Sequence, residues 1–310
     1  MDKVLLKNTD ISVFDPDVNF WIDKIKNNQY FSYSKLNHAF WEMCCNNDKY
    51  DLFVKIHGYD FVEECLNMLS EIPNDGRYYQ AVSPYGPVDH CLGPVDEMSR
   101  HIKNYFSDRE LYYGTMWKKF CFNGEMRKFI HGIRDFPMCF VGLPHVEDVA
   151  RTWNVKNSVF IGVSMDDATS KRYEILDKLK NIKNCIIIFQ CGEMLSFWLI
   201  NKLHGGDNFL IDIGRSLDVF STMNSLDATT LKLFGKIARP WWSRSYERFT
   251  CFDKIIVPYE GEYIQRLIAN RVAVATGYKI VNGLDESLES IFLLSPGEKM
   301  DHQIPMTCYA

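Results

Sequence analysis

Residues 184–220 constrain the fold of this 310-residue chain more than any other stretch. The stretch begins with a short apolar, β-branched run, residues 185–189, which is typical of a strand buried on both faces. Gly192 ends that run, and apolar residues then recur at helical spacing as far as a Gly-Gly pair. A second buried run, residues 209–213, follows. This strand–helix–strand order predicts a parallel sheet, with ligands near Gly192 and residues 212–218, where the two strands end.

The same alternation of short apolar runs and helical patterns extends along most of the chain. It predicts an α/β fold, a Rossmann-like three-layer sandwich with a mostly parallel sheet. Further strands are expected near Tyr33 and at residues 77–82, 138–142, 158–163 and 254–257. Helices are expected at residues 18–25, from about Asn37, and at 60–69, 98–106, 125–133, 165–181 and 260–273.

Composition excludes several classes of protein. The net charge of −5 and the pI near 5.9 argue against a non-specific nucleic-acid binder. No apolar run approaches the roughly 20 residues that span a bilayer, and the first residues lack the apolar core of a signal peptide. The ten cysteines form no C-x-x-C pair, which favours reduced thiols in a cytoplasmic protein. The motifs of dinucleotide oxidoreductases, P-loop kinases, α/β-hydrolases and zincin metalloproteases are absent.

Two segments of the central stretch resemble a known family. FLIDIGRSLDVF, residues 209–220, is similar to the "IDIG-S-x-LD" segment of the GT-D-type glycosyltransferases, and FQCGEMLSFWLINKL, residues 189–203, resembles the segment that precedes it there. MCFVGLPHVEDVARTW, residues 138–153, resembles a strand–turn–helix of the same family. The resemblance covers roughly residues 21–242. It implies a GT-D-like domain over residues 17–273, preceded by a loosely attached arm, residues 1–16, and followed by a C-terminal extension, residues 274–310.

The metal motif of the family is replaced in this chain. Residues 29–43, QYFSYSKLNHAFWEM, align without a gap with a family segment whose D-x-E signature holds a divalent metal against the sugar-nucleotide diphosphate. Lys35 stands in place of an arginine, and the two carboxylate positions are His38 and Phe40. Phenylalanine cannot ligate, and a single imidazole is a poor ligand for Mg²⁺, although it is acceptable for Mn²⁺. We therefore expect no metal or other cofactor, although a divalent ion such as Mn²⁺ would be chemically possible.

The resemblance and the strand ends together give a set of candidate site residues. An aspartate that ends an apolar strand is costly unless it is bound or hydrogen-bonded, so Asp212 is either a site residue or a buried cap. Asp218 either accepts the proton of the acceptor or orders the local turn. Basic residues and helix N-termini can neutralise a diphosphate without a metal. The residues assigned to catalysis are Asp212 and Asp218, and those assigned to substrate binding are Lys35, Asn37, His38, Gly192, Gly214, Arg215 and Arg239.

These features favour sugar transfer, with two alternatives. The resemblance implies transfer from a nucleotide sugar, UDP-linked by analogy, to a hydroxyl of a glycan or glycoconjugate. The replaced metal motif leaves open a catalytically inactive relative that binds nucleotide or glycan, or that serves as an assembly scaffold. A methyltransferase on a similar sheet is a third interpretation, but the glycine-rich first loop that it needs is absent.

Overall fold

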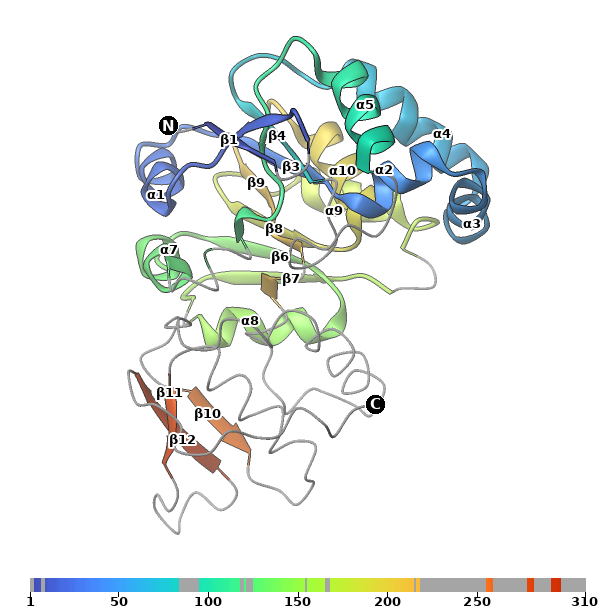
Figure 1. Ribbon diagram of the computed structural model, residues 1–310. Coiled ribbons are helices and arrows are strands. Elements are labelled where there is room, and N and C mark those ends of the chain that lie inside the picture. Colours follow the sequence, from blue (N-terminus) through green and yellow to red (C-terminus); the bar gives the residue numbers. More distant parts are fainter. Residues whose placement is uncertain are drawn as a thin grey trace, which may run out of the picture.

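A nine-stranded sheet, parallel except for the antiparallel pair at one edge, organises the protein in the computed structural model (Figure 1). The predicted α/β class with a mostly parallel sheet is therefore confirmed. Across the sheet, the order is β1 (Lys3–Leu5), β2 (Ser12–Phe14), β5 (Tyr112–Tyr113), β4 (Tyr78–Val82), β3 (Ser32–Leu36), β9 (Phe209–Asp212), β8 (Ile186–Gln190), β6 (Met138–Gly142) and β7 (Ser158–Gly162).

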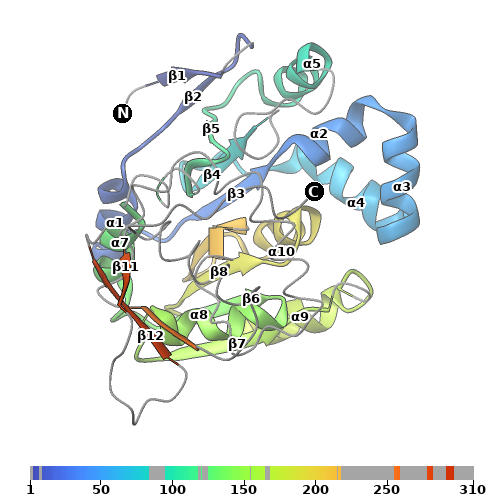
Figure 2. The same cartoon turned by 60° about the horizontal axis from the view of Figure 1, so that its bottom comes forward.

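The structure describes most of the first 217 residues. The described residues are 3–6, 9–83, 95–117, 120, 125–153, 155–164, 168–214 and 216–217, and the backbone of three strands beyond them. The helices in this part are α1 (Val18–Lys26), α2 (His38–Cys45), α3 (Asn47–His57), α4 (Tyr59–Met68), α5 (Val95–Phe106), α7 (Glu125–Ile133), α8 (Glu147–Thr152), α9 (Arg172–Lys180) and α10 (Glu193–Leu203). In both views α2, α3 and α4 lie together at one side of the molecule (Figures 1 and 2).

The handedness of the parallel connections explains which helices share a face. The chain moves one way across the sheet from β2 to β3, from β5 to β6 and from β6 to β7, through α1, α7 and α8. It moves the other way from β3 to β4 and β5, and from β7 to β8 and β9, through α2–α5, α9 and α10. Right-handed crossovers place these two sets of helices on opposite faces of the sheet.

Two apolar cores confirm this layered arrangement. The first lies between the sheet and α1, α7 and α8, and includes Trp21 and Phe129. The second lies between the sheet and α2, α4, α5, α9 and α10, and includes Phe40 and Trp198. Strand residues alternate between the two cores, as the two-residue period of a strand requires; Ile186 and Ile188 belong to the first core and Ile187 to the second.

The N-terminal residues are not the loosely attached arm that the sequence predicted. β1 pairs antiparallel with β2, and β2 pairs with β5, so residues 3–5 and 12–14 extend the main sheet. Leu6, Ile11 and Val13 are buried in the second core. Such short strands carry little periodic signal, and their structure depends on a partner, β5, that lies about a hundred residues away.

Val13→Ala should lower the free energy of unfolding by about 2 kcal/mol, because it removes two buried methyl groups and leaves a small cavity. Val4, which faces Val13 across the strand pair, is 45% exposed and provides a matched control. Val4→Ala should change the free energy of unfolding by less than about 0.5 kcal/mol. Urea unfolding measures both, and equally small effects would show that this segment is not docked.

Three strands near the C-terminus form a second, antiparallel sheet. Its order is β10 (Ile255–Pro258), β12 (Ile291–Pro296) and β11 (Tyr278–Val281). The predicted strand at residues 254–257 is present, but it pairs with β12. The predicted boundary at residue 273 thus falls between two paired strands. The predicted helix at residues 260–273 lies outside the described residues.

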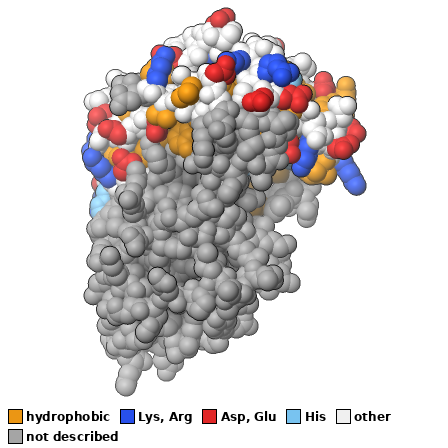
Figure 3. Space-filling view, in the orientation of Figure 1, with side chains coloured by type: hydrophobic (Ala, Val, Ile, Leu, Met, Phe, Trp, Pro, Cys, Tyr) orange, Lys and Arg blue, Asp and Glu red, His pale blue; other side chains and the backbone are white. Residues whose placement is uncertain are grey.

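Among the described residues, no helix combines the length and the apolar character needed to cross a bilayer. On the face drawn in Figure 3, acidic and basic side chains of the described part are interspersed.

Candidate functional site

The strand ends that the sequence singled out meet at one edge of the sheet. β3, β9 and β8 are consecutive parallel neighbours, with Tyr33 opposite Ile211 and Phe189 opposite Asp212. Parallel strands end at the same edge, so the residues that follow β3, β9 and β8 are brought together there. We call the region at the carboxyl ends of these three strands the strand-end site; it contains Lys35, Asn37, Gly192, Asp212 and Gly214.

A buried ion pair lies at the centre of the strand-end site. Lys35 Nζ is 3.9 Å from Asp212 Oδ1, and the two residues are 6% and 1% exposed. Asp212 Oδ2 has no hydrogen-bond partner among the described residues. Burial raises the pKa of Asp212 to about 6, although the Lys35 ammonium and the Gly214 amide act in the opposite direction. Asp212 is therefore a carboxyl group that titrates close to neutrality.

Gly214 lets the chain close over this pair. Its amide donates a hydrogen bond to Asp212 Oδ1 at 3.0 Å, and its φ of +53° lies in the left-handed region that favours glycine. A Cβ at this position would overlap Lys35 Nζ. The ammonium group thus occupies the space that any other residue at position 214 would need.

Gly192 and the start of α10 form the neighbouring part of the site. Gly192 is the N-cap residue of α10, with φ of +91° and ψ of 148°, a conformation open almost only to glycine. The next residue, Glu193, accepts a hydrogen bond from the backbone amide of Asn37. This bond joins the loop after β8 to the loop after β3, across β9 between them.

Asn37 and His38 mark the start of α2, as the sequence predicted. Asn37 is the N-cap residue, but its side chain makes no capping hydrogen bond. Its Oδ1 atom is buried without a partner among the described residues. Gly114, after β5, approaches so closely that a Cβ there would lie 2.8 Å from this oxygen. His38 is half-buried as the first residue of α2.

Phe40, which the sequence comparison aligned with the second carboxylate of the D-x-E motif, belongs to the core. Its side chain is 0% exposed, and its ring centroid lies 5.4 Å from that of Trp41 and 6.2 Å from that of Phe197. Its ring packs between α2 and α10 rather than at the strand-end site. Positions 38 and 40 therefore offer at most one metal ligand.

No family model, curated protein or solved structure matched the chain.

Three candidate residues lie outside the part of the chain that the structure describes. They are Asp218, Arg215 and Arg239. The roles predicted for them, proton acceptance by Asp218 and phosphate binding by the two arginines, stay predictions. The other candidates, Lys35, Asn37, His38, Gly192, Asp212 and Gly214, all lie at the carboxyl ends of β3, β8 and β9.

Sequence reasoning missed three residues at or near the strand-end site. Glu193 looks like an ordinary first-turn acid of a helix, and only the strand order brings it to Asn37. Tyr33 precedes Lys35 on β3 and donates a hydrogen bond to the carbonyl oxygen of Tyr113 at 2.9 Å. Cys191 lies 3.3 Å from Ser196 Oγ, and burial raises the pKa of its thiol to about 12. Burial therefore favours the protonated form of this thiol over the reactive thiolate.

Proposed function

We propose that the protein is a glycosyltransferase of the GT-D type that uses a nucleotide sugar, and that the strand-end site is its donor site. The observation that carries this proposal is the buried Lys35–Asp212 pair at the carboxyl ends of two adjacent parallel strands. Ligands of open α/β sheets bind at this edge. The segments that resemble the family contain the same two residues, so the motif and the geometry point to one place.

Charge neutralisation is the first requirement of sugar transfer from a nucleotide diphosphate. The Lys35 ammonium lies beside Gly214 at the carboxyl end of β3, and as a point charge it could balance the diphosphate leaving group. The N-terminus of α10 lies in the next loop and adds the positive end of a helix dipole. These groups support a reaction that does not depend on a metal ion.

Proton acceptance from the acceptor hydroxyl is the second requirement. A general base works best when its pKa lies near the working pH, and the pKa of Asp212 is raised to about 6 by burial. Oδ1 faces Lys35 and the Gly214 amide, whereas Oδ2 is left for a further hydrogen bond. We assign Asp212 as the base and its Oδ2 as the atom that takes the proton.

The burial of Phe40 favours a second candidate function. Its core position removes one of the two carboxylates that hold the metal in related enzymes, and Glu193 engages the Asn37 amide at the same loop. A protein that retained the nucleotide site but lost sugar transfer would show both features. The second candidate is therefore a catalytically inactive protein that binds nucleotide or glycan.

Asp212→Asn should lower nucleotide release from UDP-sugars by about 10²-fold or more, the usual contribution of a general base, without weakening UDP binding, because Lys35 keeps its charge. Asp207, exposed just before β9 at the opposite edge of the sheet, provides the matched control Asp207→Asn, which should alter neither quantity. Turnover would be measured with a panel of UDP-sugars and UDP binding by calorimetry, in a chelator and then with Mn²⁺ added back.

The outcomes separate the two candidates. Turnover that persists in the chelator supports metal-independent transfer, and turnover that needs Mn²⁺ contradicts metal independence. UDP binding without turnover, across the panel, favours the inactive binder. Absence of both binding and turnover would overturn the assignment of the strand-end site to a nucleotide.

A further inference from the structure

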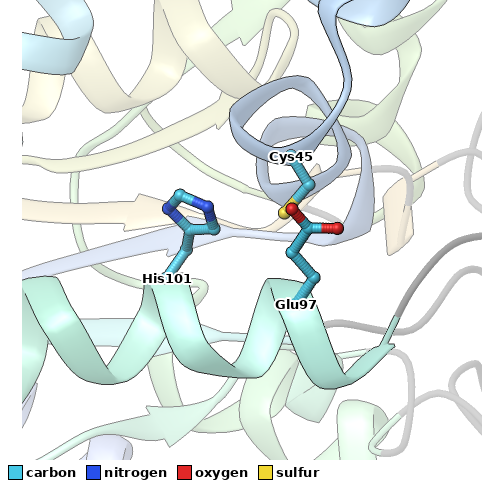
Figure 4. A group of neighbouring side chains, drawn as sticks. All are labelled: Cys45, Glu97 and His101. Atoms are coloured by element: carbon cyan, nitrogen blue, oxygen red, sulfur yellow. The ribbon is translucent and has the colours of Figure 1, made fainter.

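A cluster of three potential metal ligands lies between α2 and α5. Cys45 is the last residue of α2, and Glu97 and His101 lie on α5 (Figure 4). The Cys45 sulfur, a Glu97 carboxylate oxygen and a His101 ring nitrogen all lie within 4.8 Å of one another. All three residues are half-buried, so the cluster is neither sealed in the core nor spread on an open surface.

The fold holds the three side chains in this arrangement. Glu97 and His101 are four residues apart on α5 and therefore project from the same face of the helix. The residues that follow them, Met98 and Ile102, are fully buried in the second core and fix the rotation of α5. Trp41, one helical turn before Cys45, packs against Phe106 with ring centroids 5.8 Å apart. Both helices are thus anchored by core contacts that do not involve the cluster.

The donor set matches the preferences of zinc. Thiolate sulfur, imidazole nitrogen and carboxylate oxygen are its usual ligands, and catalytic-type sites combine three protein ligands with a water molecule. In a tetrahedral site, neighbouring ligand atoms are about 3.4–3.6 Å apart. The three ligand atoms now lie up to 4.8 Å apart. Rotation about the side-chain bonds of the half-buried Glu97 and His101 can shorten these separations to the tetrahedral values. The charges also balance, since one thiolate and one carboxylate neutralise a divalent ion.

We propose that Cys45, Glu97 and His101 bind a zinc ion, with water at the fourth position, and that this ion fastens α2 to α5. The bond between the Cys45 sulfur and its proton breaks as the sulfur–zinc bond forms, and the proton passes to the solvent without any change of oxidation state. The site is separate from the strand-end site and does not depend on the proposed sugar transfer.

Cys44 provides a matched control within the same turn. It is also half-buried, but it is not part of the cluster. Burial raises the pKa of its thiol to about 12, with smaller contributions from Cys45 and from Glu193 near the strand-end site. Burial, followed by the neighbouring Glu97 carboxylate, also raises the pKa of Cys45, to about 11, so zinc must displace its proton.

The test uses the full chain without a histidine tag, reduced and stripped of metal, and titrated with Zn²⁺ against a chromophoric chelator. We expect one zinc ion to bind per chain, with release of about one proton. Cys45→Ser, Glu97→Gln and His101→Gln should each weaken binding by at least about 10–100-fold, the range already seen when only supporting residues of metal sites are changed. Cys44→Ser should bind zinc as the unmodified chain does. Cobalt in place of zinc should give a sulfur-to-metal charge-transfer band that Cys45→Ser abolishes.

Folding is checked separately, because an unfolded variant could lose the cluster or take up zinc at the other cysteines of the chain. Circular dichroism and thermal melting of the metal-free variants should match those of the unmodified chain, and zinc should raise the melting temperature only where the cluster is intact. Should Cys45→Ser fail to fold, Glu97→Gln and His101→Gln carry the test, because both side chains leave the core unchanged. Absence of stoichiometric binding, or binding that survives all three substitutions, would overturn the proposal.

Discussion

Lys35→Met should lower the free energy of unfolding by about 3–5 kcal/mol at pH 8, because it leaves the Asp212 carboxylate buried and unpaired. The two charged groups are 3.9 Å apart, and both residues are almost fully buried. Methionine keeps most of the aliphatic length of lysine, so the loss reports on charge more than on packing. Urea unfolding of the two proteins measures it directly.

The same substitution should matter less at acidic pH. The pKa of Asp212 is raised by burial, from 3.8 to about 6, so the folded state favours the protonated carboxyl group. The stability that the protonated Asp212 carboxyl group contributes is fully present below about pH 4 and is lost as the pH rises through about 6. Below pH 4 Asp212 is neutral, and removing Lys35 no longer isolates a charge. The cost of Lys35→Met should therefore increase between pH 4 and pH 8.

Two controls make this prediction specific. In the double variant Lys35→Met/Asp212→Asn the buried charge is absent, so much of the lost stability should return at pH 8. Lys178, which pairs with Glu174 on the exposed face of α9 at 2.9 Å, provides the surface comparison. Lys178→Met should cost less than about 0.5 kcal/mol. Equal, pH-independent costs for Lys35 and Lys178 would show that the buried ion pair contributes no more to the free energy of unfolding than the exposed pair does.

The central part of the fold could be predicted because its signals are local. The β-branched run before Gly192, the helical spacing after it and the second run ending at Asp212 lie within about 30 residues, and β8, α10 and β9 form there as expected. The tendency of parallel strands to present their carboxyl ends at one edge then placed Lys35, Gly192 and Asp212 together.

Features that depend on long-range neighbours could not be predicted. The Glu193–Asn37 hydrogen bond joins residues 156 positions apart, and it exists only because β3, β9 and β8 are adjacent. The cluster of Cys45, Glu97 and His101 likewise needs α5 to dock on α2. The helix α3 was missed for a different reason, because none of its residues is fully buried and its apolar face is short, consisting of Tyr50, Phe53 and Val54.

Phe40→Glu should lower the free energy of unfolding by at least about 4 kcal/mol, because it removes a buried aromatic ring and places a carboxyl group among apolar side chains. Phe40 is 0% exposed and packs against Trp41 and Phe197. His38→Asp, in contrast, changes a half-buried residue in the first turn of α2, where an acidic side chain favours the helix dipole. We expect that substitution to change stability by less than about 1 kcal/mol.

The double variant His38→Asp/Phe40→Glu introduces a D-x-E motif at residues 38–40 and tests whether the motif alone creates a metal site. A metal site needs both carboxylates to reach the same point, and the core position of residue 40 directs its side chain between α2 and α10. We therefore expect the double variant to be destabilised like Phe40→Glu and to gain no Mn²⁺ affinity in calorimetry. Phe40→Leu, which keeps an apolar side chain, separates the loss of the ring from the burial of the charge. A stable double variant that binds Mn²⁺ would instead mean that residue 40 can turn toward the strand-end site, and that only two substitutions separate this chain from a metal-dependent one.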